Sequence, residues 1–281
     1  MNRRSMNMLV YFFSAIVAIQ VALPMYWMVS TAFRPEREIY EGYILPQEFT
    51  LSSMMAIFGF GEKEATVGGS ITLPLINSVF VSFTVMAIST VLGVLGGYAL
   101  ARIKFIGRDI LSTISLFTYI FPIVVLIVPL FLILSSWRLT DTYAGLILAE
   151  LAITLPYTLW MLRGFFATIP QEIEEAAIVD GCSRLGVITR IIIPLSTPGI
   201  AATAVYAFIL AWNNVLFPLI LINREELQLV PTALLLYMKA DFVPWDRLMA
   251  ACCVASVPPA ALFFLVQRYI VGGLTAGAVK G

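Results

Sequence analysis

The chain has 281 residues, of which 60% are hydrophobic and 12% are charged, and its formal net charge is zero. A soluble domain carries about twice that fraction of charged residues. The composition therefore predicts an integral membrane protein, and the balanced charge gives no indication of nucleic acid binding. The chain contains no histidine, so it lacks the commonest metal ligand and the usual proton carrier near neutral pH.

Six apolar segments follow one another along the chain, and each exceeds or approaches the about twenty residues that a spanning helix needs. The first follows Arg3 and Arg4 and is too long for the apolar part of a signal peptide, so we interpret it as an uncleaved span. The sequence therefore predicts an all-α integral membrane protein with six transmembrane helices. The predicted spans are residues 8–33, 71–101, 110–137, 143–166, 191–222 and 248–266.

Charged residues between the spans indicate the orientation. Basic residues outnumber acidic ones on the side that carries both termini, and acidic residues outnumber basic ones on the other side. Because cytoplasmic loops are enriched in Lys and Arg, we expect both termini to be cytoplasmic. The predicted divisions are residues 1–34 (N-terminus and first span), 35–70 (an extracytoplasmic segment), 71–268 (a transmembrane domain of five helices) and 269–281 (a cytoplasmic tail).

Proline and glycine residues predict the bends and close contacts of these spans. Each proline removes a backbone hydrogen bond, so kinks are expected. Gly93 and Gly97 have the spacing that lets two helices approach closely. We interpret this as ordinary packing within a bundle, with rocking of bent helices between two openings as the functional alternative. The prolines concerned are Pro122, Pro129, Pro156, Pro218, Pro258 and Pro259.

Two polar features lie within the predicted spans. Glu150 is ionisable, and an ionisable residue in a span normally faces a partner or a water-filled cavity. A place in a transport pathway and a structural pairing role are both open for it. Trp212, Asn213 and Asn214 lie midway along the fifth span. Their aromatic face and amides suit a sugar, and hydrogen bonding between helices is the alternative.

The segment at residues 168–190, between the fourth and fifth spans, carries several of the few charges and predicts a short helix outside the lipid. Thr168 and Gln171 have the spacing of a capping box, and Pro170 suits a first helical turn. Gly181 is expected to end the helix in the left-handed conformation, and Ser183 is expected to cap the next helix. The result is a compact polar knob on the cytoplasmic side.

A longer pattern runs through this segment, in which Glu175-Ala176-Ala177 is followed by Asp180-Gly181, Ile191 and Pro194-Leu195. It resembles the EAA signature of permease subunits in binding-protein-dependent ABC importers, whereas the alternative is a plain polar connecting loop. In that family the segment is the coupling helix, which sits in a cleft of the ATP-hydrolysing subunit. The resemblance implies ATPase contacts for Glu174, Glu175, Ala176, Ala177, Asp180, Gly181, Arg184 and Pro194.

The resemblance extends over nearly the whole chain. It includes Ser30–Pro35, Asn77-Ser78, Tyr98–Arg102 and Trp212-Asn213, and the ending from Arg268 to Gly281 resembles the smaller permease subunit of maltose-type importers. It implies a type I ABC importer permease fold with a tail that reaches between the ATPases. A frayed terminus is the alternative that composition favours. The implied tail contacts are Leu274, Thr275, Ala276, Gly277 and Lys280.

The function expected from these features is transport rather than catalysis. The sequence has no GxxxxGK[ST] phosphate-binding loop and no histidine for a catalytic triad, so we predict a chain that is not an enzyme and binds no metal or cofactor. The resemblance implies alternating access in the bacterial inner membrane, with ATP and Mg on partner subunits. An ion-coupled carrier or passive channel is the alternative, and a structural anchor is a third. The implied partners are a second homologous permease, two ATP-binding subunits, an extracytoplasmic sugar-binding protein, the sugar and membrane lipid.

Overall fold

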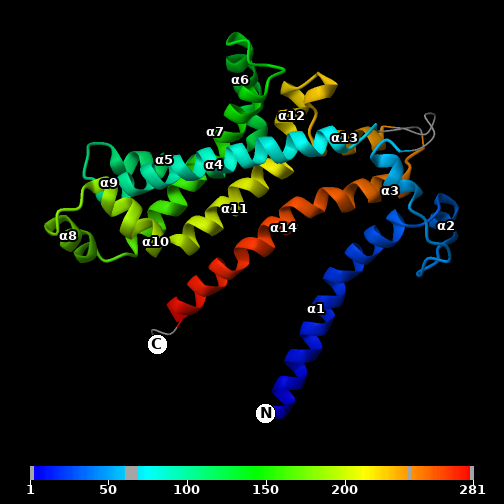
Figure 1. The fold of residues 1–281 in the computed structure, drawn as a ribbon, viewed down its shortest axis with the longest axis horizontal. Coiled ribbons are helices and arrows are strands. Elements are labelled where there is room, and N and C mark those ends of the chain that lie inside the picture. The colour runs from blue at the N-terminus through cyan, green and yellow to red at the C-terminus, as the bar shows by residue number, and fades with distance from the viewer. Residues whose placement is uncertain (1–2, 61–68, 240–241, 279–281) are drawn as a thin grey trace. The chain divides into compact units, whose positions relative to one another are not determined.

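The computed structural model describes residues 3–60, 69–239 and 242–278, and within them every regular element is a helix (Figure 1). The all-α prediction is confirmed for this part of the chain. The chain forms two compact units. The first comprises Met1–Thr72 and Ala233–Val257, and the second comprises Leu73–Thr232 and Pro258–Gly281. The division falls within α13 (Val230–Met238) and α14 (Trp245–Ala278), so each of these two helices contributes residues to both units.

The first unit begins with α1 (Arg3–Ala32), followed by α2 (Glu36–Glu41) and α3 (Ser52–Ile57). Arg34 is 1% exposed and folds the chain after α1 back onto that helix. Its guanidinium donates to Ser30 Oγ and, at 2.6 Å, to the carbonyl oxygens of Tyr43 and Ile44. A small apolar core completes this unit: Ala32, Ile57, Ile71, Tyr237, Leu248, Ala250 and Ala251.

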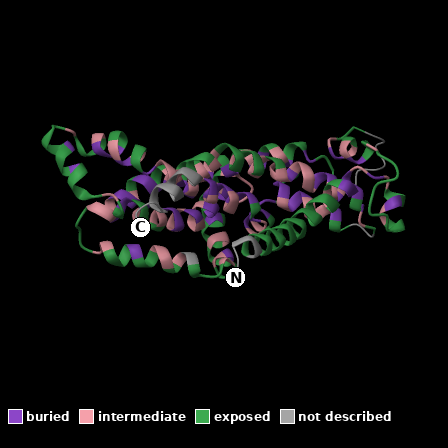
Figure 2. Ribbon diagram, turned by 90° about the horizontal axis from the view of Figure 1, so that it is seen from below, coloured by how far each residue is buried: buried purple, intermediate pink, exposed green. Residues whose placement is uncertain are grey.

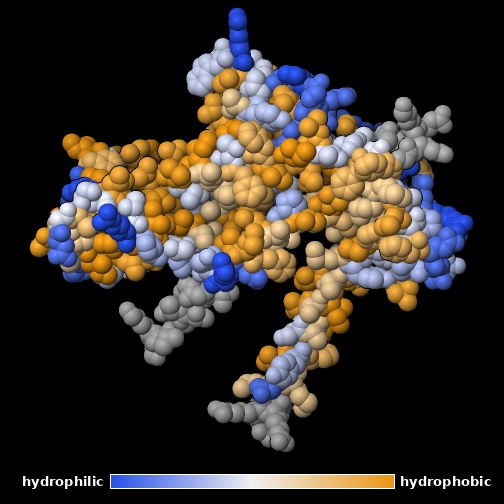
Figure 3. Space-filling model, in the orientation of Figure 1, coloured by the Kyte–Doolittle hydropathy of each residue, from blue (hydrophilic) through white to orange (hydrophobic). Residues whose placement is uncertain are grey.

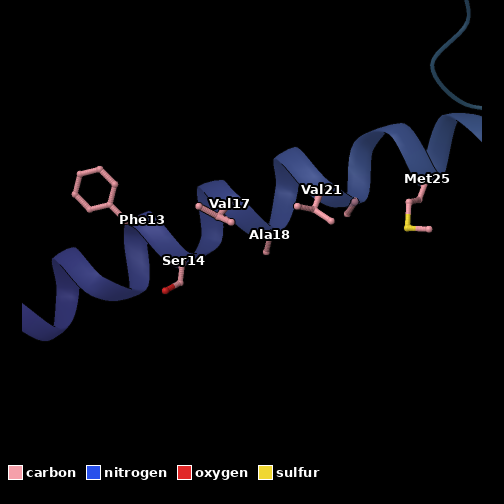
Figure 4. Close-up of a pocket in the computed structure, with 7 residues that line it drawn as sticks. Phe13, Ser14, Val17, Ala18, Val21 and Met25 are labelled. Carbon is pink, nitrogen blue, oxygen red and sulfur yellow. The ribbon is translucent and has the colours of Figure 1, made fainter. Parts of the chain in front are cut away.

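Most of α1 is exposed, as the green ribbon beside the N-terminus in Figure 2 shows. Most of its exposed side chains are apolar, and apolar residues cover much of the surface drawn in Figure 3. A shallow apolar depression runs along one side of the helix, where Figure 4 shows Val17, Val21 and Met25 following one another. An apolar helix surface of this kind is what lipid contact requires, because the helix satisfies its backbone hydrogen bonds internally.

The second unit contains the longest helix that has no proline beyond its first turn, α4 (Thr72–Arg102). The helices that follow α4 are α5 (Arg108–Ile120), α6 (Ile123–Ser136), α7 (Tyr143–Ala167), α8 (Gln171–Val179), α9 (Arg184–Val187), a π-helix (Ile188–Ile192), α10 (Ile193–Leu195), α11 (Thr197–Asn213), α12 (Leu216–Leu221) and a 3-10 turn (Glu225–Leu227).

Two of the predicted spans are not continuous helices. The span predicted at 110–137 breaks between α5 and α6, which are bent by 106°, because Pro122 cannot donate a backbone hydrogen bond and holds Phe121 in an extended conformation. The span predicted at 191–222 bends by 83° before α11 and breaks again after Asn213. Among the described residues, four helices are long and apolar enough to cross a membrane, or up to six if each bent pair is one span.

Close packing between α4 and α7 depends on glycine, as the spacing of Gly93 and Gly97 predicts. A Cβ atom added to Gly97 would lie 3.1 Å from the backbone nitrogen of Arg163 and 3.1 Å from Leu162 Cβ, so a larger side chain would force the helices apart. Next to these glycines in α4, Val94 and Tyr98 belong to a core cluster whose other members are Leu162, Phe166, Ala177, Val187, Ile188 and Ile192. This cluster brings α7 and the segment after it against α4.

Candidate functional site

The helix α8 and the turn after it form the coupling knob, defined here as Gln171–Gly181. Its ends follow local sequence signals. Gly181 has φ +86° and ends the helix in the left-handed conformation, and Ser183 Oγ accepts a hydrogen bond from Gly186 N at 3.1 Å to cap α9. Both predictions are confirmed. The predicted capping box is wrong, because Thr168 instead closes α7 by donating to Phe165 O, and Pro170 precedes α8.

The inner face of the coupling knob is fixed to α4 by a buried ion pair. Glu174 Oε1 accepts from Arg102 Nε at 2.5 Å, and its Oε2 accepts from the Tyr98 hydroxyl at 2.9 Å. The two charged side chains are 8% and 7% exposed. Arg102 also donates to Ile169 O at 2.6 Å, and Ala177 lies in the core cluster beside Tyr98. The knob is therefore held against α4 by both charge and packing.

The opposite face of the knob is open. Among the predicted coupling residues, Glu174 and Ala177 face inward, whereas the others are exposed: Glu175, Ala176, Asp180, Gly181, Arg184 and Pro194. Ile178 and Val179 add exposed apolar side chains, with Val179 86% exposed. The structure thus places a mixed acidic and apolar surface on the knob, of a kind that a protein partner can bind. The ATPase role of these residues stays a prediction.

The predicted tail contacts lie at the end of the chain. The backbone of α14 continues as helix through Leu274, Thr275, Ala276 and Gly277 to Ala278. Lys280 lies outside the described residues. The helix therefore extends past the predicted start of the tail at residue 269, and the ATPase contacts proposed for this segment stay a prediction.

Of the predicted pathway residues, the structure brings Glu150 and Asn214 together. Glu150 is 0% exposed, and its Oε2 accepts from Asn214 Nδ2 at 3.2 Å. Asn214 lies in the break between α11 and α12, where its Oδ1 accepts from Leu216 N at 3.0 Å. Glu150 Oε1 has no hydrogen-bond partner within the described part of the chain. The hydrogen bond to Asn214 gives Glu150 one partner, and both its structural role and its pathway role stay predictions.

Trp212 and Asn213 point elsewhere. Trp212 is 4% exposed and stacks on Phe208 with ring centroids 5.5 Å apart, so its aromatic face is occupied. Asn213 is exposed at the end of α11, a helix that is otherwise buried or half-buried. Of the three predicted polar residues in this span, Asn213 is therefore the exposed one, and its contact with a sugar stays a prediction.

A second polar cluster, which sequence reasoning did not predict, lies at the other end of α4. Asn77 Nδ2 donates to the carbonyl oxygens of Glu226 and Gln228, each at 2.9 Å, and its Oδ1 accepts from the Tyr143 hydroxyl at 2.7 Å. Ser78 Oγ accepts from Val230 N at 2.8 Å. The signal in the sequence was the Asn77-Ser78 pair at the start of an apolar span, where amide and hydroxyl groups need partners.

The carbonyl groups of Glu226 and Gln228 belong to a turn that begins at Asn223. This turn is also bound by Asp141, which follows α6. Its Oδ1 accepts from Asn223 N at 2.5 Å and from Arg224 N at 3.1 Å. These backbone hydrogen bonds, that of Asn223 first, hold the pKa of Asp141 below its usual value. Asp141 has φ +56°, a conformation that Asp tolerates better than most residues. The 223–228 turn (Asn223–Gln228) is thus fixed by side chains from α4 and from the α6–α7 connection.

Comparison with known proteins gives the family. Residues 89–275 match the family described as binding-protein-dependent transport system inner membrane component. The inner membrane ABC transporter permease protein YcjP of Escherichia coli is 35% identical, and the alignment covers 100% of this chain and 99% of that protein. The sulfoquinovosyl glycerol transport system permease protein SmoH of Agrobacterium fabrum is 32% identical over 95% of this chain and 92% of that protein.

The fold is also found in a solved structure. A chain from the crystal structure of a bacterial ABC transporter involved in the import of the acidic polysaccharide alginate superposes with a TM-score of 0.77 at 20% sequence identity. The match covers 95% of this chain and 96% of that chain. Because both chains match almost end to end, this chain shares the fold of that transporter chain.

Proposed function

The chain belongs to the binding-protein-dependent transport system inner membrane components, and from this premise we propose that it carries a sugar or sugar derivative inward through alternating access driven by ATP. It is a multi-pass permease of the inner membrane, and ATP hydrolysis takes place on a separate subunit of such transporters. Relatives named for sulfoquinovosyl glycerol and alginate transport support a carbohydrate as the substrate class.

The observation that carries the coupling proposal is the two-faced coupling knob. Its inner face is fixed by Glu174 and Ala177, and its outer face leaves Glu175, Ala176 and Asp180 free. A partner that binds the outer face can therefore move the transmembrane helices while the contacts between the inner face and α4 stay intact. We propose that this partner is an ATP-binding subunit, one of two, and that the helical tail through Gly277 lies close to the same subunits.

We also propose a division of labour in the predicted pathway. Asn213 is exposed and offers amide donors and an acceptor to the hydroxyl groups of a sugar. Asn214 and Glu150 hold the helix break beside it. Trp212 packs against Phe208 and does not take part. A second homologous permease completes the pathway, and an extracytoplasmic binding protein delivers the sugar.

The coupling proposal is tested by adding bulk to the outer face of the knob. In Ala176→Trp the chain should still insert in the membrane, because residue 176 is exposed and makes no core contact. The tagged variant should no longer co-purify with ATP-binding subunits, and its membranes should lose sugar-stimulated ATP hydrolysis. Glu41→Trp, which places the same bulk on the exposed end of α2, should retain both. Co-purification of ATP-binding subunits with Ala176→Trp at the unmodified level would contradict the proposal.

The substrate class is tested in cells. Uptake of a panel of radiolabelled disaccharides and glycerol-linked sugars is measured in cells with and without the gene. Loss of uptake for one member of the panel, restored by the unmodified chain, is the expected result. Asn213→Ala should then raise the KM of uptake for that sugar while the amount of assembled complex stays the same. An unchanged KM would remove Asn213 from the pathway.

A further inference from the structure

Among the long helices of this chain, α4 has the properties of a rigid rod. Its 31 residues correspond to about 46 Å of α-helix. Pro74 lies in its first turn, where the missing N–H costs nothing, and no proline follows within the helix. Gly93 and Gly97 lie against α7, where a Cβ atom would meet Thr158 or Leu162 side chains. The glycines are therefore points of support for the rod and not free hinges.

One end of α4 is fastened to the coupling knob. Tyr98 and Arg102, one helical turn apart, both bind the carboxylate of Glu174, and Arg102 also binds the carbonyl oxygen of Ile169. The ion pair is more than nine-tenths buried on both sides. Breaking such a pair leaves a buried charge without a partner, so the attachment resists being pulled open.

The other end of α4 is fastened to the 223–228 turn. Asn77 is 2% exposed and makes three hydrogen bonds, two of which go to backbone carbonyl oxygens of the turn. Ser78 is 0% exposed and accepts the backbone N–H of Val230 just after the turn. The turn itself is exposed between Asn223 and Glu226. In Figure 1, α8 lies beyond the C-terminal end of α4, whereas α12, which precedes the turn, lies beside the N-terminal half of α4.

The neighbouring helices do not offer the same unbroken connection. Pro156 interrupts the hydrogen bonding of α7, α5 and α6 meet at 106°, and α11 stops at Asn213 well before the turn. A displacement of the knob is absorbed at such breaks in the other helices. Along α4 a displacement of the knob reaches the 223–228 turn, because both ends of this helix are bound by buried polar groups and the helix between them is continuous.

We propose that α4 is the link through which the coupling knob and the 223–228 turn move together, with Glu174 and Asn77 as positioning residues at its two ends. This inference rests on the proposed coupling of the knob to ATP-binding subunits. Because coupling between two sites is reciprocal, a protein that docks on the turn from outside the cell also acts on the knob through the same helix.

The test uses the whole complex with a reporter on the turn. Cys182, Cys252 and Cys253 are replaced by serine, and Glu225→Cys supplies a single exposed thiol. Its rate of reaction with a membrane-impermeant maleimide is measured without nucleotide and with ATP plus vanadate. The rate should change by about fivefold or more on trapping, the lower range of allosteric coupling. Glu174→Ala and Asn77→Leu should each abolish the change.

Matched variants separate this link from general damage. Asp109→Asn, which removes an exposed acid at the start of α5, and Ile76→Ala, exposed beside Asn77, should keep the response. Combining Glu174→Arg with Arg102→Glu rebuilds an ion pair of opposite polarity and should restore part of the response that Glu174→Arg removes. A nucleotide response that survives in both Glu174→Ala and Asn77→Leu would overturn the proposal, as would a turn that never responds.

The outcomes also separate this inference from the proposed function. If ATP-binding subunits fail to co-purify with the unmodified chain, the proposed function fails. If the ATP-binding subunits co-purify and hydrolyse ATP, but the rate of the maleimide reaction at position 225 does not change with nucleotide, only the link through α4 fails.

Discussion

Glu174 and Glu150 are both glutamates buried in the same unit, but they have very different partners. Glu174 lies in the short helix α8 and accepts hydrogen bonds from the guanidinium of Arg102 and the hydroxyl group of Tyr98. Glu150 lies within α7 and binds one amide, with its second oxygen unpartnered among the described residues. The comparison indicates that Glu174 joins α8 to α4 through a buried ion pair, whereas Glu150 of α7 binds the helix break at Asn214 through one hydrogen bond.

The largest expected effect concerns the Glu174 pair. Arg102→Gln leaves the buried carboxylate of Glu174 without its cation, and this should lower the free energy of unfolding by about 3–5 kcal/mol. Unfolding of the purified chain in a denaturing detergent titration measures the loss. Arg108→Gln removes the partner of Asp109 in an exposed pair and should cost no more than about 1 kcal/mol. Equal losses in the two variants would show that burial of the Glu174 pair carries no special weight.

Glu150 should respond less, and in a way that depends on its hydrogen bond. Glu150→Leu leaves Asn214 Nδ2 without an acceptor and should cost about 1–3 kcal/mol in the same titration. Glu150→Gln keeps a carbonyl oxygen for Asn214 and should recover most of that loss. If Glu150→Gln proved as damaging as Glu150→Leu, the charge of Glu150 would matter more than its hydrogen bond, and the contrast with Glu174 would disappear.

The turn after α8 tests how much of the knob is held locally and how much by Glu174. Gly181→Ala places a Cβ atom in the left-handed conformation and should cost about 1–2 kcal/mol. Gly164→Ala is the control, since Gly164 lies in α7 and an added Cβ atom would meet open space, so the change should stabilise the chain by about 0.4–1 kcal/mol. Thermal unfolding followed by circular dichroism compares the two variants. A neutral Gly181→Ala would mean that the long-range ion pair alone defines the knob.

The sequence predicted those parts of the fold that depend on neighbouring residues. Apolar runs indicated the membrane helices, Gly181 and Ser183 marked the ends of two helices, and the EAA pattern indicated the family. The capping box predicted for Thr168 and Gln171 was wrong, because a Thr at this position fits the end of α7 as well as it fits the start of α8. Asn213 and Asn214 lie in a long apolar run, and no local rule shows that the helix stops there.

The sites that depend on distant residues could not be predicted in the same way. Glu174 and Arg102 are separated by 72 positions, and Asn77 binds carbonyl groups 149 and 151 positions away. Spacing along one helix gives no information about such pairs. Amides, hydroxyls and charges at the ends of an apolar span did indicate that partners are needed, because buried polar groups are costly unless they are bonded. Which partners they find is decided by the packing of α4, α7 and the connections.

The smallest expected effect on stability is that of replacing Asp141. This carboxylate provides a comparison for the two buried glutamates, Glu174 and Glu150. Its pKa is lowered by the backbone N–H groups of Asn223 and Arg224. A carboxylate with a lowered pKa in the folded state stabilises the fold above its unfolded value of about 3.9, and the contribution is lost as the pH falls through the lower folded value. Asp141→Asn keeps the left-handed backbone and removes the charge, so the stability difference between the two proteins should shrink from pH 5 to pH 3. Thermal unfolding across that range measures it, and a difference independent of pH would show that Asp141 holds the 223–228 turn through its shape alone.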